Sequence, residues 1–201
     1  MGSQARLDRT QARPEPRVKG VAFRTIDDCF GELCGAAARE RASSLMPPAV
    51  AESYRFGTLL SASWYPISWY REVLQAFRAS ANAGPDLPRR IGAMAVRLDM
   101  QGAHKRFVAW LVSPQSMLAL SQRLFSTYYD TGRIELIESR RGFARVRAFE
   151  CFGWDHNMWS ELMGSSGALL EECGAEHVRV RGISGGRDGD DHLEFEAHWV
   201  I

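Results

Sequence analysis

The chain has 201 residues, a usual size for one domain and enough to bury a full hydrophobic core. Hydrophobic residues make up 45% and charged residues 24%, and the formal net charge is +1, so no global field draws the chain toward nucleic acid or an anionic membrane. No apolar run approaches the ~18 residues of a membrane span, and the N-terminus lacks the apolar core of a secretion signal, so we expect a cytoplasmic protein.

The N-terminal segment is polar and shows no apolar periodicity. We therefore expect residues 1–17 to be a disordered basic tail and residues 18–201 to form a single domain. The stretch VKGVAFRTI (18–26) favours a first strand or an extended lead-in. Asp27 or Asp28 can then cap a helix that runs to about Ser43.

Helical patterns continue through the middle of the chain. Pro66 suits a first helical turn, and apolar residues from Ile67 to Phe77 follow at helical spacing. Three further helical pieces are predicted, at residues 86–100, 104–112 and 113–132.

The pattern changes to strands after Gly132. Residues 133–139 and 142–151 favour a hairpin, 155–174 a helix, and 177–183 and 192–200 two alternating strands. The predicted fold class is therefore α/β of the α+β type, with N-terminal helices packed on a C-terminal antiparallel sheet of β-β-α-β-β order. In the last strand, one face carries the apolar residues Leu193, Phe195, Ala197 and Trp199.

The loop SGGRDGDD (184–191) is rich in Gly and Asp, a composition that also occurs in metal and phosphate sites. Its acids do not match the calcium-loop spacing, and no Lys-Ser/Thr pair follows its glycines, so we interpret it as a hairpin turn. The sequence predicts no metal site. Basic residues are not interleaved with aromatic platforms, so we also expect no nucleic-acid partner.

The stretch CFGWDHNMWS places Cys151, Asp155 and His156 close together at a strand-to-helix junction. A Cys/His nucleophilic pair is one interpretation. The other is that Cys151 ends a strand inside the core and Asp155 caps the following helix. We favour the second, and we expect all four cysteines to be reduced thiols.

Aromatic residues are dense, with Trp64, Tyr65, Trp69 and Tyr70 inside seven positions. Such side chains build cores, dimer interfaces and apolar pockets alike, and the sequence leaves these three alternatives open.

Taken in order, VKGVAFRTI, SWYPISWYREVLQAF and the late β-β-α-β-β unit resemble an uncharacterised domain family found mainly in myxobacteria. The anchors of this resemblance are Gly20, Phe23, Trp64, Tyr65, Pro66 and Trp69. The C-terminal stretches GWDHNMWSELMGSSGALLEECGAEHVRV and EFEAHW resemble the broader superfamily of haem-NO-binding, vinyl-reductase-type and vesicle-tethering (TRAPP/Bet3-type) domains.

The resemblance implies an α/β domain with a pocket between helices and sheet, often dimeric, whose members bind haem, small aromatic molecules or acyl chains, or act as scaffolds. Haem-binding relatives use a Tyr-x-Ser-x-Arg motif and an axial histidine. The final strand LEFEAHW lacks that motif, so we expect neither haem nor another cofactor.

Three hypotheses follow. The favoured one is a non-catalytic sensory or binding module that holds an apolar small molecule. The predicted ligand-binding residues are Trp64, Tyr65, Trp69, Phe77, Trp110 and Trp159. The alternative is a homodimeric protein-interaction scaffold of the vesicle-tethering type that uses the same aromatic residues at a surface. The third is a thiol-dependent enzyme that uses Cys151, Asp155 or His156.

Overall fold

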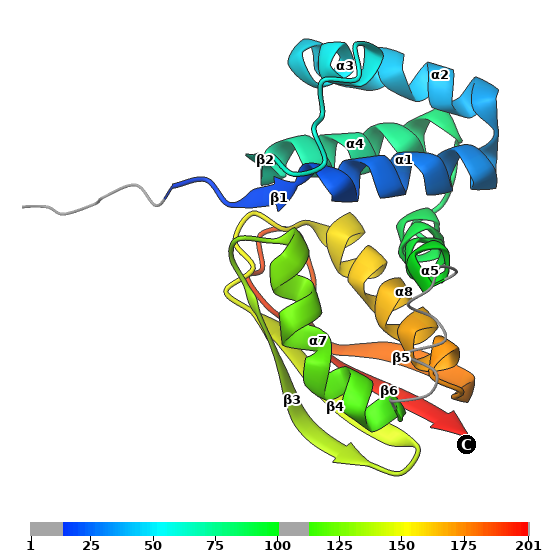
Figure 1. The fold of residues 1–201 in the computed structure, drawn as a ribbon, viewed down its shortest axis with the longest axis vertical. Coiled ribbons are helices and arrows are strands. Elements are labelled where there is room, and N and C mark those ends of the chain that lie inside the picture. The colour runs from blue at the N-terminus through cyan, green and yellow to red at the C-terminus, as the bar shows by residue number, and fades with distance from the viewer. Residues whose placement is uncertain (1–13, 101–112, 201) are drawn as a thin grey trace, which may run out of the picture.

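The computed structural model describes residues 14–100 and 113–200, with helices first and a sheet last (Figure 1). The helices are α1 (Gly20–Cys34), α2 (Ala36–Leu45), α3 (Pro48–Arg55), α4 (Ile67–Ser80), α5 (Leu87–Met100), α7 (Pro114–Tyr128) and α8 (His156–Glu172). The strands are β1 (Arg17–Lys19), β2 (Trp64–Pro66), β3 (Arg133–Arg140), β4 (Phe143–Phe149), β5 (Glu176–Gly185) and β6 (Leu193–Val200). Within these ranges, no helix combines the length and apolar character that crossing a bilayer requires.

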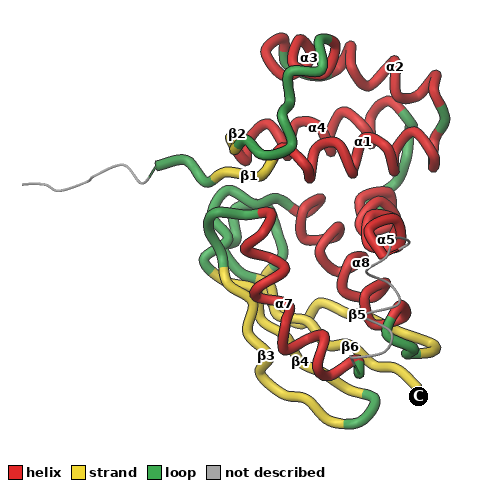
Figure 2. The backbone as a smooth tube through the Cα atoms, in the orientation of Figure 1, coloured by secondary structure: helices red, strands yellow, loops and turns green. Residues whose placement is uncertain are grey.

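The elements form two layers, which Figure 2 shows by their secondary structure. Helices α1 and α4 lie side by side, with α2 and α3 above them, and the short strands β1 and β2 pair at one end of this helical layer. Below it, α7 and α8 cross one face of a four-stranded sheet, and α5 packs along α8.

The C-terminal sheet has the strand order β3-β4-β6-β5, and all its neighbouring strands are antiparallel. With α8 between β4 and β5, this is the predicted β-β-α-β-β unit, so the predicted fold class is confirmed. Leu193, Phe195, Ala197 and Trp199 are buried as expected, because alternate side chains of a strand point to opposite faces. On the other face, Arg145 Nε lies 2.8 Å from Glu194 Oε1.

The first predicted strand is shorter in the structure, and the helix starts earlier. The strand ends at Lys19, and α1 begins at Gly20. The amides of Gly20 and Val21 donate to the carbonyls of Ser63 and Ser61 at 2.8 and 3.0 Å. A Cβ at position 20 would lie 2.1 Å from the Leu60 carbonyl oxygen, so only glycine allows this approach.

The predicted cap of that helix is also wrong, because Asp27 lies inside α1. It is buried there, and its carboxylate pairs with the Arg39 guanidinium of α2. The predicted single helix to about Ser43 is two helices, because the chain breaks at Gly35, whose φ of 84° favours glycine.

Two predictions fall on segments that the structure does not describe. Most of the predicted tail, residues 1–13, lies outside the described residues, as does the predicted helix at 104–112. The proposed domain boundary at residues 17/18 therefore stays a prediction. Near it, the Pro16 carbonyl already accepts a hydrogen bond of 2.8 Å from the Ile67 amide.

Helices α5 and α8 cross so closely that their backbones are in contact. A Cβ at Gly92 would lie 2.2 Å from the Glu161 carbonyl oxygen, and a Cβ at Gly164 would lie 2.0 Å from the Arg89 carbonyl oxygen. Glycine at both positions lets the two helices approach more closely than side chains would allow. This crossing fixes the part of α8 that carries Glu161.

Candidate functional site

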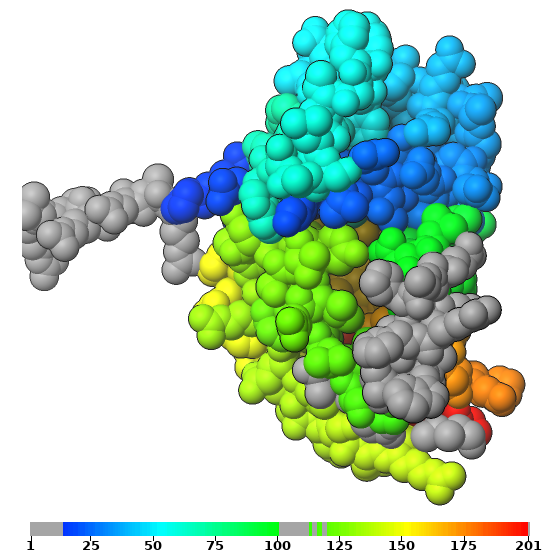
Figure 3. All heavy atoms as spheres, viewed as in Figure 1, coloured from blue at the N-terminus to red at the C-terminus, as the bar shows by residue number. Residues whose placement is uncertain are grey.

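A cavity of about 260 Å³ lies where the helical layer meets the sheet. Its walls come from α1, α4, α5, α7 and α8, and its floor from β3, β4 and β6. Figure 3 shows the surface hollowed between α5 and α7, with atoms of α8 at the bottom. Most lining side chains are apolar, among them Ala22, Ile26, Leu124, Val146, Leu162 and Phe195. A concave, mostly apolar space with few polar groups is typical of small-molecule sites.

Glu161 is the most unusual group in this lining. It stands on α8 and is only 8% exposed. The hydroxyl of Tyr70, on α4, donates a hydrogen bond of 2.7 Å to its Oε1 atom, whereas its Oε2 atom is buried and has no hydrogen-bond partner in the described part of the chain. Burial raises the pKa of Glu161 from 4.5 to about 7, although the Tyr70 hydrogen bond opposes this shift. A buried carboxylate oxygen without a donor costs free energy that a bound ligand can recover.

The other polar groups of the cavity are phenols, a second carboxylate and the hydroxyls of Thr25, Ser121, Ser165 and Ser166. The Tyr128 hydroxyl donates to Asp99 Oδ2 at 3.1 Å, and burial raises the pKa of Asp99. Burial also raises the pKa of Tyr129 well above its usual range, as does the nearby carboxylate of Glu161. Among the described lining residues there is no lysine, arginine or histidine. The site is therefore apolar, with acidic polar groups.

A row of aromatic rings supports the α7 wall. Phe125 and Tyr129 line the cavity and pack against Trp154, with ring centroids 5.7 and 4.9 Å apart. Trp154 in turn lies 4.6 Å from Trp159. Both tryptophans are buried in the core. This packing fixes the position of the wall that a ligand would contact.

The residues predicted as the ligand site are not brought together. Trp64 lies under the Lys19 ammonium at 5.2 Å, Tyr65 stacks on Trp69 at 5.9 Å, and Phe77 stacks on Phe30 at 4.1 Å. Trp159 packs behind Trp154, and Trp110 lies outside the described residues. The cavity lining includes none of the five that the structure describes. Whether any of them contacts a ligand stays a prediction.

The sequence analysis did not single out Glu161. The signal available was one acid inside the predicted helix, three positions after the apolar Met158. In a helix, a residue three or four positions from apolar neighbours shares their face, which here faces the core.

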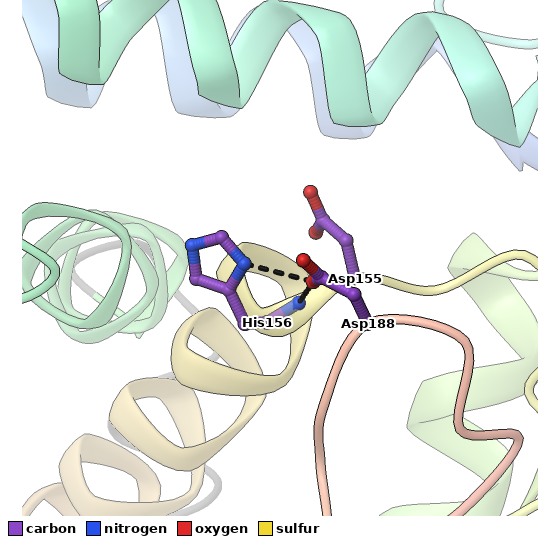
Figure 4. A group of neighbouring side chains, drawn as sticks. All are labelled: Asp155, His156 and Asp188. Carbon is purple, nitrogen blue, oxygen red and sulfur yellow. Dashed lines mark hydrogen bonds and ion pairs between the residues drawn. The ribbon is translucent and has the colours of Figure 1, made fainter.

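Asp155, His156 and Asp188 form a small cluster at the start of α8, shown in Figure 4. Asp188 Oδ1 accepts hydrogen bonds from the His156 amide and from its Nδ1, both at 2.8 Å. Both Asp155 oxygens accept from donors in α8, and Arg78 Nη1 contacts His156 Nε2. These hydrogen bonds hold the loop before β6 on the N-terminus of α8. The predicted lack of a metal site stays a prediction.

The thiol interpretation of this junction finds no geometric support. Cys151 is fully buried, and its Sγ donates to the Phe149 carbonyl at 3.5 Å. Burial raises the pKa of the Cys151 thiol to about 12, which disfavours the nucleophilic thiolate. Asp155 caps α8, as the alternative interpretation predicted.

Solved structures with a similar fold are H-NOX domains. One from K. algicida has a TM-score of 0.69 at 14% identity and covers 91% of this chain and 97% of its own. One from S. oneidensis has a TM-score of 0.68 at 14% identity, with 91% and 96% covered. An oxygen-binding H-NOX domain related to soluble guanylate cyclases has a TM-score of 0.65 at 11% identity, with 90% and 94% covered. No family model matches the sequence, and no curated protein matches it. The chain therefore has the fold of an H-NOX domain.

Another structure with this fold concerns haem redox potential and porphyrin distortion. We therefore compare the residues that line the cavity with the groups that hold a haem in proteins. Haem iron is commonly held by imidazole or thiolate, and the anionic propionates are neutralised by cations. The described lining residues include no histidine, cysteine, lysine or arginine, and burial keeps Tyr70 and Tyr129 protonated by raising their pKa values. The described lining therefore supplies no imidazole, thiolate or cation to a haem, and the expected absence of a cofactor stays a prediction.

Proposed function

We propose that this chain is a non-catalytic sensory or binding module that holds a small, largely apolar molecule in the cavity between its helices and its sheet. The observation that carries this proposal is a largely apolar cavity of about 260 Å³ that contains a buried carboxylate oxygen without a partner among the described residues. Removing apolar ligand surface from water there would contribute about 25 cal/mol for each Å². An oxygen-binding domain among the structures of similar fold supports a sensory role.

The contacts proposed for the ligand are the lining residues. The rings of Phe125 and Tyr129 and the side chains of Ile26 and Leu162 would surround its apolar part. Of the aromatic residues predicted from sequence, Trp159 would act indirectly, by supporting Trp154 behind that wall.

The direct test measures ligand binding by the wild type and by a variant in which a larger side chain fills the cavity. Native mass spectrometry of the purified protein should show retained small molecules, and calorimetry should show that propylbenzene binds. Ala95→Phe, on the cavity side of α5, should abolish propylbenzene binding. Ala93→Phe, two residues earlier and outside the lining, is the matched control and should bind as the wild type does. A wild-type protein that binds neither propylbenzene nor any retained molecule contradicts the proposal.

We also propose the finer parts of the sequence interpretation. These are membership of the uncharacterised myxobacterial domain family, a relation to vinyl-reductase-type and vesicle-tethering domains, and a cytoplasmic location. The H-NOX fold is compatible with the superfamily relation, because haem-NO-binding domains are one branch of it.

A homodimeric interaction scaffold is the second candidate function. It is favoured by Phe56 and Leu60, which are 71% and 63% exposed, in a segment that also contacts Tyr65. Large exposed apolar side chains close together are typical of interaction surfaces. Light scattering of Phe56→Glu and Trp69→Glu tests this candidate. A wild-type dimer that both variants convert to monomer supports the scaffold, and a wild-type monomer contradicts it.

A further inference from the structure

We infer that the cavity selects a small alkyl or aryl amine, whose ammonium group pairs with Glu161 while its hydrocarbon part lies among the apolar side chains. This inference rests on the proposed binding function and adds the chemical class of the ligand.

The charges of the lining favour a cation over an anion. Glu161 and Asp99 are the ionisable carboxyl groups of the cavity, and its described lining contains no basic side chain. An anionic ligand, such as a fatty acid or a phosphate ester, would meet like charge, and the described lining offers no cation to neutralise it. An ammonium group would meet opposite charge in a space of low dielectric, where pairing is strong.

The Glu161 carboxylate also has an oxygen that can accept a further hydrogen bond. Tyr70 satisfies Oε1 at 2.7 Å, which leaves Oε2 buried and without a partner among the described residues. An ammonium group carries three N–H donors, so one ligand can donate to Oε2 and still bind a second acceptor. Breaking a buried pair is costly because one charge is left alone, and completing the pair recovers that cost.

Aromatic rings complete the surroundings of a cation. Phe125, Tyr128 and Tyr129 line the cavity from α7 and the residue that follows it. The faces of such rings attract cations within about 6 Å. The same rings, with Ile26 and Leu162, provide apolar contact for the hydrocarbon part of the ligand. An amphipathic amine matches both properties of the site.

Pairing with Glu161 makes binding depend on pH. Among the described residues, the titratable groups whose charge acts on Glu161 or responds to it are Tyr70 on α4, Cys29 on α1, Tyr129 after α7 and Asp155 at the start of α8, and none of these four is a basic group. With a pKa of about 7, the carboxyl of Glu161 is mostly protonated at pH 6 and mostly ionised at pH 8. Affinity for an ammonium ion should therefore rise about tenfold over this range, since the ionised fraction rises by that factor.

The experiment compares three probes of similar shape by isothermal titration calorimetry on the wild-type protein. They are 2-phenylethylamine, neutral propylbenzene and anionic 3-phenylpropionate. We expect the amine to bind at least tenfold more tightly than propylbenzene at pH 8, and 3-phenylpropionate to bind at least tenfold more weakly. Only the amine should gain affinity between pH 6 and pH 8, with proton release near pH 7.

Glu161→Gln provides the matched variant, because a glutamine Oε1 can still accept the Tyr70 hydrogen bond. It should lose at least tenfold in amine affinity and keep its propylbenzene affinity within twofold. The wild-type probe series and its pH profile need no variant, so the inference stays testable if Glu161→Gln does not fold.

The outcomes separate the two proposals. If propylbenzene binds and the amine binds no more tightly, the amine inference is overturned while the binding module stands. The amine inference is also overturned if the amine binds equally well to Glu161→Gln. If none of the three probes binds to the wild type and native mass spectrometry shows no retained molecule, the proposed binding function itself fails.

Discussion

Tyr70 and Glu161, 91 residues apart in the sequence, are joined by a buried hydrogen bond of 2.7 Å between α4 and α8. The bond links the helical layer to the helix that crosses the sheet, and it holds the Glu161 carboxyl at the cavity wall. Because burial raises the pKa of this carboxyl to about 7, its ionised form destabilises the unliganded fold. Stability and ligand binding are therefore coupled at this one residue.

We predict that Glu161 makes the protein less stable as pH rises. Its pKa is raised from 4.5 to about 7 in the folded protein, so between these values the folded state holds the proton more tightly than the unfolded state. The free energy of unfolding should fall by about 3 kcal/mol from this group across that window and stay level above it. Urea denaturation at pH 5, 6, 7 and 8 measures the effect.

Glu161→Gln has no titrating group at this position. The variant should therefore become more stable relative to the wild type as the pH rises from 5 to 8. Glu40→Gln, at an exposed site on α2, is the control and should follow the wild type at every pH. A Glu161→Gln curve parallel to the wild-type curve would show that this carboxyl titrates as an ordinary glutamate.

The glycines at the α5–α8 crossing should not tolerate alanine. Gly92→Ala or Gly164→Ala would drive a Cβ into a backbone carbonyl of the facing helix, at 2.2 or 2.0 Å. We expect each to lower the free energy of unfolding by about 2–3 kcal/mol, because backbone has to move. Gly167→Ala on the same helix meets its nearest neighbour at 3.5 Å and should raise stability by about 0.5–1 kcal/mol through helix propensity. Equal effects at Gly164 and Gly167 would contradict the close crossing.

Asp155 should stabilise the start of α8 as a cap. Its Oδ1 accepts hydrogen bonds from the amides of Asn157 and Met158, at 3.1 and 3.0 Å. Asp155→Ala should cost about 1–2 kcal/mol of unfolding free energy, measured by thermal or urea denaturation. Asp155→Asn keeps the Oδ1 acceptor and should cost less. An alanine variant as stable as the wild type would rule out the capping role.

Cys151, like the equally buried Cys29, should be spared by native-state alkylation. It is fully buried with a pKa raised to about 12, whereas Cys34 is only half-buried at the end of α1. Iodoacetamide at pH 8 followed by peptide mass spectrometry should label Cys34 first and Cys151 only in urea. Fast labelling of Cys151 in the native protein would return the thiol-enzyme hypothesis to consideration.

The C-terminal fold could be predicted because its signals are local. Alternation at Leu193 to Trp199 shows directly which strand face is buried, and Asp155 before an apolar helical pattern marks where α8 begins. The N-terminal helices were harder to place. The early start at Gly20 depends on backbone contacts with Leu60 and Ser63, far away in the sequence. The break at Gly35 is local, at a glycine with a positive φ inside a helical pattern.

The cavity could not be predicted from local patterns. Its walls come from five helices, and the space between them depends on how closely α5 and α8 approach. Aromatic density pointed to Trp64, Tyr65 and Trp69, yet Tyr65 and Trp69 stack on each other near β2. A single acid such as Glu161 in an amphipathic helix is usually solvated, so its burial beside Tyr70 emerges only from the packed structure.

The most direct measurement of the central claim is the position of bound propylbenzene, from intermolecular nuclear Overhauser effects in methyl-labelled protein. The account predicts contacts between the ring protons of the ligand and the methyl groups of Ile26, Val146 and Leu162, which line the cavity. Contacts confined to the region of Trp64 and Trp69, or no bound ligand at all, would contradict it.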